Sequence, residues 1–333
     1  MNTKILGITV IALSFTIGWL LMDYHAARYH SIALAKPVLI EIIKGDSLSQ
    51  ICHKLKNQQV DFKPFWFKFL AYYDNVAGQL KTGEYELPSG LTLPQIITLF
   101  AQGKTKHYSI TFPEGWQFKD YLRALENIPQ LEHRIDYSNN LKDVLQQLAI
   151  EQPHPEGLFF PDTYYFEKST TDIALLKRAF GKMQEVLQQE WSQKAEGLPL
   201  KDPYEALILA SIIEKETALP SERALIASVF LHRLKAKMLL QTDPAVIYGM
   251  GENFKGNIKA QDLKTVTPYN TYMVKGLPPS PIAMPGRDAI HAALHPDASN
   301  KLYFVARGDG SHVFSATLKE HNIAVYQFQK KKK

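Results

Sequence analysis

The first strong pattern along the chain is a continuous apolar run. Residues 5–22 contain no charged side chain and consist mainly of Ile, Leu, Val, Phe and Trp. About 20 helical apolar residues are needed to cross the hydrocarbon core of a bilayer, so the run predicts a membrane-spanning helix. A cleaved signal peptide is the alternative, but no small-x-small cleavage site follows Met22. Lys4 on the short side favours a cytoplasmic segment at 1–4, an anchor at 5–22 and an exported remainder.

After the anchor, the pattern changes from one apolar run to short alternating and helical stretches. We expect a polar stalk at 23–37 and a small α+β unit at 38–107, where Thr92 and Gln95 have capping-box spacing ahead of an apolar segment. Apolar spacing and turn residues then place the elements of this unit. They are a strand at 38–43 and helices at 48–55, 64–73 and 92–103.

The longer part of the chain, 108–329, is predicted to be a mixed α/β unit. Its turn-rich aromatic block at 155–165 does not resemble a helix, and the pattern leaves open whether these rings pack in a core or line a polysaccharide cleft. The remaining expected elements follow from apolar periodicity. They are a strand at 108–112 and helices at 118–126, 141–151, 171–191, 204–217 and 221–237.

Composition narrows the class of protein. With 333 residues, 45% hydrophobic and 21% charged, the chain has the size of about two domains and the composition of an ordinary globular protein. The net charge is +5, but the lysine tail at 330–333 supplies four of these charges, so we expect no nucleic-acid surface. The single cysteine, Cys52, excludes an intrachain disulfide and a cysteine-rich metal site, and its position on an apolar helical face predicts a buried side chain.

Several common chemistries are missing from the sequence. It has no GxGxxG, no P-loop, no HExxH and no Gly-x-Ser-x-Gly motif. The histidines are scattered, without ligand spacing to Asp or Glu. We therefore expect neither a metal nor a cofactor.

Two glutamates at the end of the predicted helix 204–217 are the candidate acid–base groups. Ala206, Leu209 and Ile212 form an apolar stripe that reaches Glu216 after one more turn, whereas Glu214 points away from it. Burial of a carboxyl group raises its pKa, and a general acid that works near neutral pH needs such a shift. The pattern alone leaves a second reading open, in which the carboxylate only pairs with a nearby cation.

Loops downstream of this helix are dense in amide, hydroxyl and aromatic groups. Such groups suit the recognition of sugars, although they also occur in any well-structured loop. The loops are LQTDP at 240–244, YNTY at 269–272 and GLPPSP at 276–281.

Together these segments resemble a known family, the endolytic murein transglycosylases of the YceG-like (MltG) family. The resemblance covers nearly the whole chain, and it is specific because many motifs occur in the same order. They are IIEKET at 212–217, SER at 221–223, LQTDP at 240–244, YNTY at 269–272, GLPP at 276–279, HP at 295–296, YFV at 303–305 and GSHVF at 310–314.

The resemblance implies an α+β protein with an anchor, a LysM-like unit at 38–107 and a catalytic domain at 108–329. It implies cleavage of the β-1,4 bond between N-acetylmuramic acid and N-acetylglucosamine in nascent strands, which leaves 1,6-anhydro-muramyl ends. The catalytic residue would be Glu216, with Glu214 as the alternative. The predicted substrate-binding residues are Gln241, Thr242, Asp243, Tyr269, Asn270, Thr271 and Tyr272.

The resemblance also sets expectations for location and partners. The anchor would lie in the bacterial inner membrane with the catalytic domain in the periplasm, close to the cell-wall synthesis machinery. The LysM-like unit would bind glycan, or serve only to position the catalytic domain. A non-catalytic peptidoglycan-binding scaffold and a hydrolytic muramidase are the alternative functions.

Overall fold

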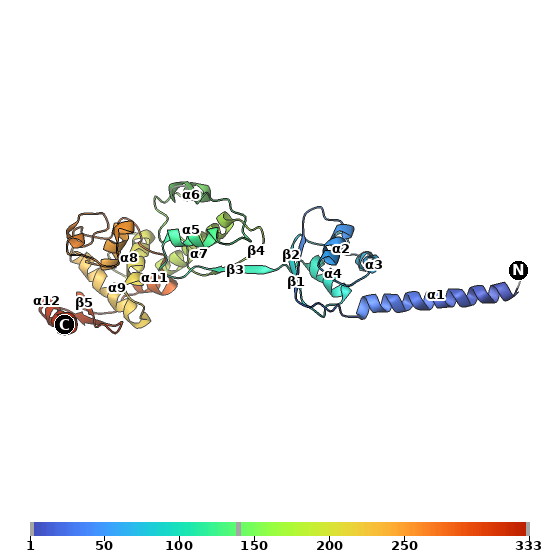
Figure 1. Ribbon diagram of the computed structural model, residues 1–333. Helices are drawn as coiled ribbons and strands as arrows, with labels where there is room; N and C mark the ends of the chain where they lie inside the picture. Colours follow the sequence, from blue (N-terminus) through green and yellow to red (C-terminus); the bar gives the residue numbers. More distant parts are fainter. Residues whose placement is uncertain (1–2, 138–140, 331–333) are drawn as a thin grey trace. The chain divides into compact units, whose positions relative to one another are not determined.

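The computed structural model describes residues 3–137 and 141–330 of the chain (Figure 1). The predicted 1–4 segment and the lysine tail at 330–333 thus lie largely outside the described residues. The chain divides into two compact units. Unit 1 comprises residues 1–108 together with 165–169, and unit 2 comprises 109–164 and 170–333. The short stretch 165–169, which the sequence pattern assigned to the larger unit, therefore groups with the smaller one.

The apolar run forms a single long helix, α1 (Thr3–Tyr29). Its large apolar side chains between Ile5 and Met22 are exposed, and the helix is long and apolar enough to cross a membrane. The helix continues past the apolar run, so the first part of the predicted stalk is helical.

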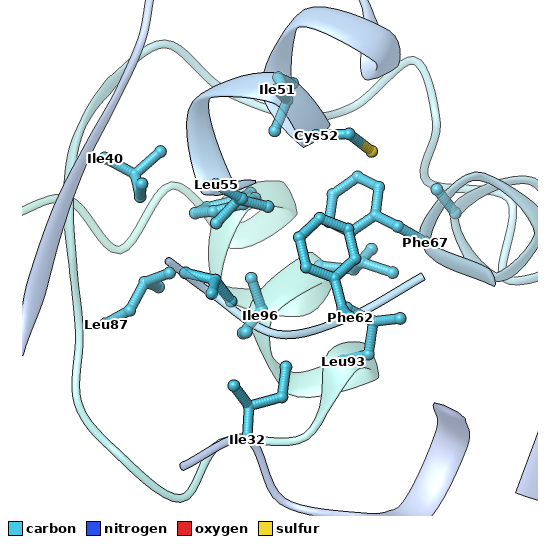
Figure 2. Close-up of a cluster of buried hydrophobic side chains, with 14 of the residues drawn as sticks. Ile32, Ile40, Ile51, Cys52, Leu55, Phe62, Phe67, Leu87, Leu93 and Ile96 are labelled. Atoms are coloured by element: carbon cyan, nitrogen blue, oxygen red, sulfur yellow. The ribbon is translucent and has the colours of Figure 1, made fainter. Parts of the chain in front are cut away.

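The rest of unit 1 places three helices around a two-stranded antiparallel sheet. Its elements are β1 (Val38–Ile42), α2 (Leu48–Asn57), α3 (Pro64–Tyr73), β2 (Gly83–Leu87) and α4 (Leu93–Gln102). The register pairs Val38 with Leu87 and Ile42 with Gly83. Figure 2 shows the shared core, in which Leu55, Phe67 and the predicted buried Cys52 meet side chains from the sheet and α4.

Local sequence signals explain where the helices of unit 1 begin and end. Ser47 and Thr92 each close a capping box with the glutamine three residues later, as expected for Thr92. Gly103 ends α4 with a left-handed backbone of φ 70°, a conformation that glycine adopts without strain.

Two further strands, β3 (His107–Thr111) and β4 (Thr163–Glu167), pair with each other. Directly after β4, Lys168 forms ion pairs with Glu41 and Glu84 of unit 1. Tyr108 donates a hydrogen bond to the other carboxylate oxygen of Glu84. The ion pairs of Lys168 tie 165–169 to both strands of unit 1.

Unit 2 is mainly helical. Its central helix is α8 (Pro203–Glu216), against which α11 (Arg287–Leu294), α9 (Pro220–Lys235) and α7 (Asp172–Ser192) pack. Most of the aromatic block is core, because residues 155–161 and Tyr164 are buried, whereas Tyr165 at its end is exposed. The other elements are α5 (Phe118–Glu126), α6 (Leu141–Leu148), α10 (Asp243–Met250), η1 (Gly251–Asn253), η2 (Asp262–Lys264), β5 (Tyr303–Ala306), β6 (His312–Ser315), α12 (Leu318–Val325) and the π-helical turn η3 (Tyr326–Lys330).

Candidate active site

Glu216 is the last residue of α8. Asp202 caps the start of this helix through the backbone N–H of Glu205, and Pro203 occupies its first turn. The helix ends after Glu216 because Thr217 adopts an extended backbone, with φ −143° and ψ 137°. The carboxyl group of Glu216 therefore stands at the C-terminal end of a buried helix.

Protein atoms surround the Glu216 carboxyl group, although part of the side chain reaches a cavity. Its pKa is raised to about 7, mainly because burial disfavours the charged form, and the negative charge of Asp243 acts in the same direction. Two groups oppose this shift. The Thr242 hydroxyl donates a 2.5 Å hydrogen bond to Oε1 of Glu216, and the nearby Arg233 guanidinium also favours the ionised form. The carboxyl group is thus poised between its acid and base forms near neutral pH.

The Glu216 side chain lines a cavity of about 390 Å³. Three of the predicted substrate-binding residues, Gln241, Asp243 and Tyr272, line it. The wall combines a carboxylate, an amide, a phenol and aromatic rings. The remaining lining residues are Arg233, Leu240, Phe304, Val305, Ala306, His312, His321, Val325 and Gln329.

Asp243 and Tyr272 act as a pair in this wall. The Tyr272 hydroxyl donates a 2.6 Å hydrogen bond to Oδ1 of Asp243. Burial and this bond raise the pKa of Tyr272, so its hydroxyl keeps its proton at neutral pH. The pair therefore holds a carboxylate in a fixed position beside Glu216.

Thr242 and Thr271 join the two predicted loops. The backbone N–H of Thr242 donates to Oγ1 of Thr271 at 3.0 Å, and the Thr271 hydroxyl donates back to the Thr242 carbonyl at 3.2 Å. Both side chains are buried. Thr271 thus fixes the residue that binds Glu216, without lining the cavity itself.

Tyr269 and Asn270 lie outside the cavity wall. Tyr269 shares a 2.7 Å hydrogen bond with the Ser280 hydroxyl. The buried Asn270 amide donates to three loop carbonyls. In the structure these two side chains hold the loops together, and their assignment as substrate contacts remains a prediction.

Arg233 was not among the predicted site residues, although it lines the cavity. Its Nε donates to the Leu302 carbonyl at 2.7 Å, and its guanidinium donates to the Leu240 carbonyl at 2.9 Å and lies 5.2 Å from the centre of the Tyr303 ring. A signal for it existed in the sequence. Arg233 is a cation that follows Ile226 and Phe230 on the inward face of a predicted helix.

His312 is a second lining residue that sequence reasoning left unassigned. Its Nδ1 lies 2.7 Å from Oε2 of Glu222, and its backbone N–H donates to Oε1 of the same carboxylate at 2.9 Å. Two of the motifs quoted from the sequence, 221–223 and 310–314, therefore meet at this contact.

Glu214 has a separate set of partners. Its Oε2 accepts a 3.1 Å hydrogen bond from the backbone N–H of Gly286, and Arg223 lies 3.7 Å from Oε1. The prediction that Glu214 points away from the buried side of the helix was wrong, because α8 is buried on all sides and the Glu214 side chain is only 8% exposed. The difference between the two acids is that Glu216 reaches the cavity, whereas Glu214 does not line it.

The fold also brings together histidines that looked scattered in the sequence. Glu190, His291 and His295 offer ligand atoms within 4.8 Å of one another. Both carboxylate oxygens of Glu190 are already 2.9 Å from partners, one from Arg287 and the other from His291. We assign no metal to this group.

Comparison with known proteins gives consistent matches over most of the chain. The model of the YceG-like family matches residues 40–327. An endolytic murein transglycosylase of Bacillus subtilis is 34% identical over 303 residues, which cover 86% of this chain and 83% of that protein. One of Streptococcus pneumoniae is 28% identical, over 86% of this chain and 57% of its own length. A crystal structure of a putative YceG-like protein from Listeria monocytogenes has a TM-score of 0.55 and 30% identity, covering 87% of this chain and all of the other.

Proposed function

The chain belongs to the YceG-like family, and we propose that it is an endolytic murein transglycosylase that cuts the glycan strands of peptidoglycan. The observation that carries the proposed chemistry is the position of Glu216, whose carboxyl group has a pKa of about 7 and reaches the cavity. Two relatives that are named for this activity each match 86% of the chain, and they support the same function.

In the proposed reaction, Glu216 acts twice on the β-1,4 bond between N-acetylmuramic acid and N-acetylglucosamine. Its protonated form first gives its proton to the leaving oxygen of N-acetylglucosamine as the bond to C1 of the muramyl residue breaks. The resulting carboxylate then takes the proton of the muramyl 6-hydroxyl, whose oxygen attacks C1 and closes the 1,6-anhydro ring. No water is consumed, and Glu216 ends protonated, as it began. A pKa near 7 suits both roles.

The residues around Glu216 divide into two groups in this proposal. Gln241, Asp243 and Tyr272 line the cavity and would contact the sugar. The Asp243 carboxylate would also stabilise the positive charge that develops at C1. Thr242 would position Glu216 and adjust its pKa, while Thr271 would support Thr242.

Replacement of Glu216 by Gln tests the assignment. The amide keeps the shape but cannot transfer the proton, so purified glycan strands should yield no 1,6-anhydro ends, and we expect the rate to fall by at least about 100-fold, the lower end of what general acid–base catalysis contributes. Mass spectrometry of the released glycans measures this. If the variant still cuts glycan, Glu216 is not the catalytic residue. If the wild-type protein binds glycan without cutting it, the protein is a scaffold.

The same measurement separates a transglycosylase from a hydrolytic muramidase. A hydrolase uses its second carboxylate as nucleophile or to activate water, and Asp243 is the second carboxylate in this cavity. A hydrolase would leave reducing ends that are heavier by one water than anhydro ends. We expect only the lighter product.

For the smaller unit we propose a LysM-like module that binds N-acetylglucosamine-containing glycan. The order β1, α2, α3, β2, with the two strands paired antiparallel, supports this proposal. A module that only positions the catalytic unit is the alternative. Addition of soluble chitin oligosaccharides to the full chain distinguishes the two. A glycan-binding module should show chemical-shift or fluorescence changes in this unit, and a positioning module should show none.

We further propose that α1 anchors the protein in the plasma membrane and that unit 2 acts outside the cytoplasm. The exposed apolar side chains of α1 support an anchor, and the substrate of the proposed reaction lies on the outer face of that membrane. Association with the cell-wall synthesis machinery would follow from this location.

A further inference from the structure

Helix α3 carries an unusual exposed face made of aromatic residues. Phe65, Phe69, Tyr72 and Tyr73 have between 41% and 71% of their surface exposed. Their spacing places them on one side of the helix, while the opposite side buries residues such as Phe67 in the core (Figure 2). Phe69 stacks with Phe65 at 6.3 Å and with Tyr73 at 5.9 Å. Contiguous apolar surface of this kind usually marks a binding or membrane-contact site.

This face lies beside the outer end of α1. Asp23, the first charged residue after the apolar run, pairs with Lys63 at 2.5 Å and accepts a 2.8 Å hydrogen bond from Nε1 of Trp66. The Tyr24 ring packs against both Trp66 and Phe69. The start of α3 is therefore bonded to α1 at the point where its apolar run stops.

The length of the apolar run determines at what depth in a bilayer the contacts between α1 and α3 would lie. Residues 5–22 span roughly 27 Å as a helix, close to the roughly 30 Å thickness of the hydrocarbon core. Asp23 would then stand at the boundary between acyl chains and headgroups. Trp19, whose ring lies 5.4 Å from the ammonium group of Lys63, would stand just inside it. Aromatic side chains concentrate at this boundary in membrane proteins.

The charges of α3 favour lipid over sugar as the partner of this face. The segment Pro64–Tyr73 has Lys68 as its one charged residue and contains no acidic or amide side chain. Sugar sites combine stacking rings with amides and carboxylates, which bind hydroxyl groups. Lysines near aromatic rings instead suit a layer of anionic headgroups.

We propose that the exposed face of α3, formed by Phe65, Phe69, Tyr72 and Tyr73, lies in the headgroup layer of the membrane that α1 crosses. This inference rests on the proposed anchoring by α1. The contact gives unit 1 a second attachment to the membrane besides the anchor, so the unit is held against the membrane surface. It would then meet glycan strands close to where they leave the membrane.

Site-specific labelling of the full chain in vesicles tests the proposal. Burial raises the pKa of Cys52 to about 11, so this thiol reacts poorly and new cysteines can be labelled selectively. A fluorophore is attached to Phe65→Cys or Tyr72→Cys in vesicles of phosphatidylcholine and phosphatidylglycerol. Nitroxide groups on the headgroups or deep in the acyl chains serve as quenchers. Ile43→Cys, an exposed position on the same unit, is the matched control, and Leu13→Cys reports on the anchor.

We expect headgroup nitroxides to cause a loss of fluorescence at positions 65 and 72 but not at 43, and deep nitroxides to quench position 13. If position 13 is quenched and positions 65 and 72 behave like 43, the α3 contact is disproved while the anchor stands. If position 13 is not quenched, the anchor proposal fails, and the α3 proposal, which rests on it, fails as well. Emission shifts at 65 and 72 with chitin oligosaccharides but not with vesicles would overturn the proposal in favour of a sugar-binding face.

Discussion

Glu216 combines several influences on one carboxyl group. Burial and the charge of Asp243 raise its pKa, whereas Thr242 and Arg233 lower it. Its place at the C-terminal end of α8 adds the unfavourable end of the helix dipole for a negative charge. The result, a pKa of about 7, depends on a balance that single substitutions can shift.

Thr242→Val should move the pH dependence of cleavage. Glu216 must be protonated to donate to the leaving oxygen, so kcat/KM should fall as the pH rises through about 7 in the wild-type protein. The Thr242 hydroxyl stabilises the ionised form. Its loss should raise the pKa, so the fall in kcat/KM should move to higher pH, by about one pH unit. A pH profile of kcat/KM on purified glycan strands measures the shift.

Thr242→Ser is the matched control for this experiment, because it keeps the hydroxyl and should keep the wild-type profile. A profile that moves equally in both variants would contradict the role of the hydrogen bond, because the serine variant retains the hydroxyl that donates to Glu216. A shift to lower pH in the valine variant would contradict the assigned role.

At the scale of the elements, helix α8 shows why the two acids must be separated by experiment. Glu214 accepts the backbone N–H of Gly286, the residue just before α11, and lies near Arg223 of α9. We therefore expect Glu214→Ala to lower the free energy of unfolding by about 1–3 kcal/mol, because a buried donor loses its acceptor. Cleavage should remain within a few-fold of wild type.

Glu214→Gln should retain both stability and cleavage. Burial raises the pKa of Glu214, which means that the fold disfavours its charge, and a neutral amide can still accept from Gly286. Chemical denaturation and glycan cleavage measured on the same samples check both variants. Loss of cleavage in Glu214→Gln, with cleavage retained in Glu216→Gln, would exchange the roles of the two residues.

The elements that sequence predicted well are those encoded by local signals. Apolar periodicity and caps such as Thr92 with Gln95 predicted helices in unit 1 close to their observed bounds. The short elements α10 to α12 and the hairpin of β5 and β6 were not predicted, because they alternate with proline-rich loops and have few turns of their own. The apolar stripe in α8 does not separate a buried side from an exposed one, since a helix surrounded by others has no polar face.

The site itself could be predicted only in part. The resemblance to a family selected Glu216 and the loops that surround it, but their roles depend on contacts between distant positions. Thr242 meets Glu216 across 26 residues, and Arg233 meets the Leu302 carbonyl across 69. No local pattern reports such contacts. Contacts between distant positions also explain why Tyr269 and Asn270, which belong to the same motif as Tyr272, face other loops instead of the cavity.

At the scale of the whole molecule, the chain enters unit 2 after residue 108, returns to unit 1 at 165–169 and then leaves it again. Unit 1 therefore includes a short segment, 165–169, that is separated from the rest of the unit in sequence by residues 109–164 of unit 2. Lys168 makes this dependence specific. Its ammonium group lies 2.9 Å from Oε2 of Glu41 on β1 and 3.2 Å from Oε1 of Glu84 on β2. Because the Glu84 side chain is only 9% exposed, its charge needs this partner.

Lys168→Met should therefore destabilise unit 1 without affecting the cavity of unit 2. Glu84 would keep the Tyr108 hydroxyl but lose its cation, and we expect a loss of about 1–2 kcal/mol, reduced by the partial exposure of Lys168. Hydrogen exchange followed by mass spectrometry should show faster exchange in β1 and β2 than in the wild type and unchanged exchange in α8. Lys168→Arg retains the charge and should resemble the wild type. Equal acceleration in α8 and in β1 would mean that the two units unfold together, which would contradict a stabilising role confined to unit 1.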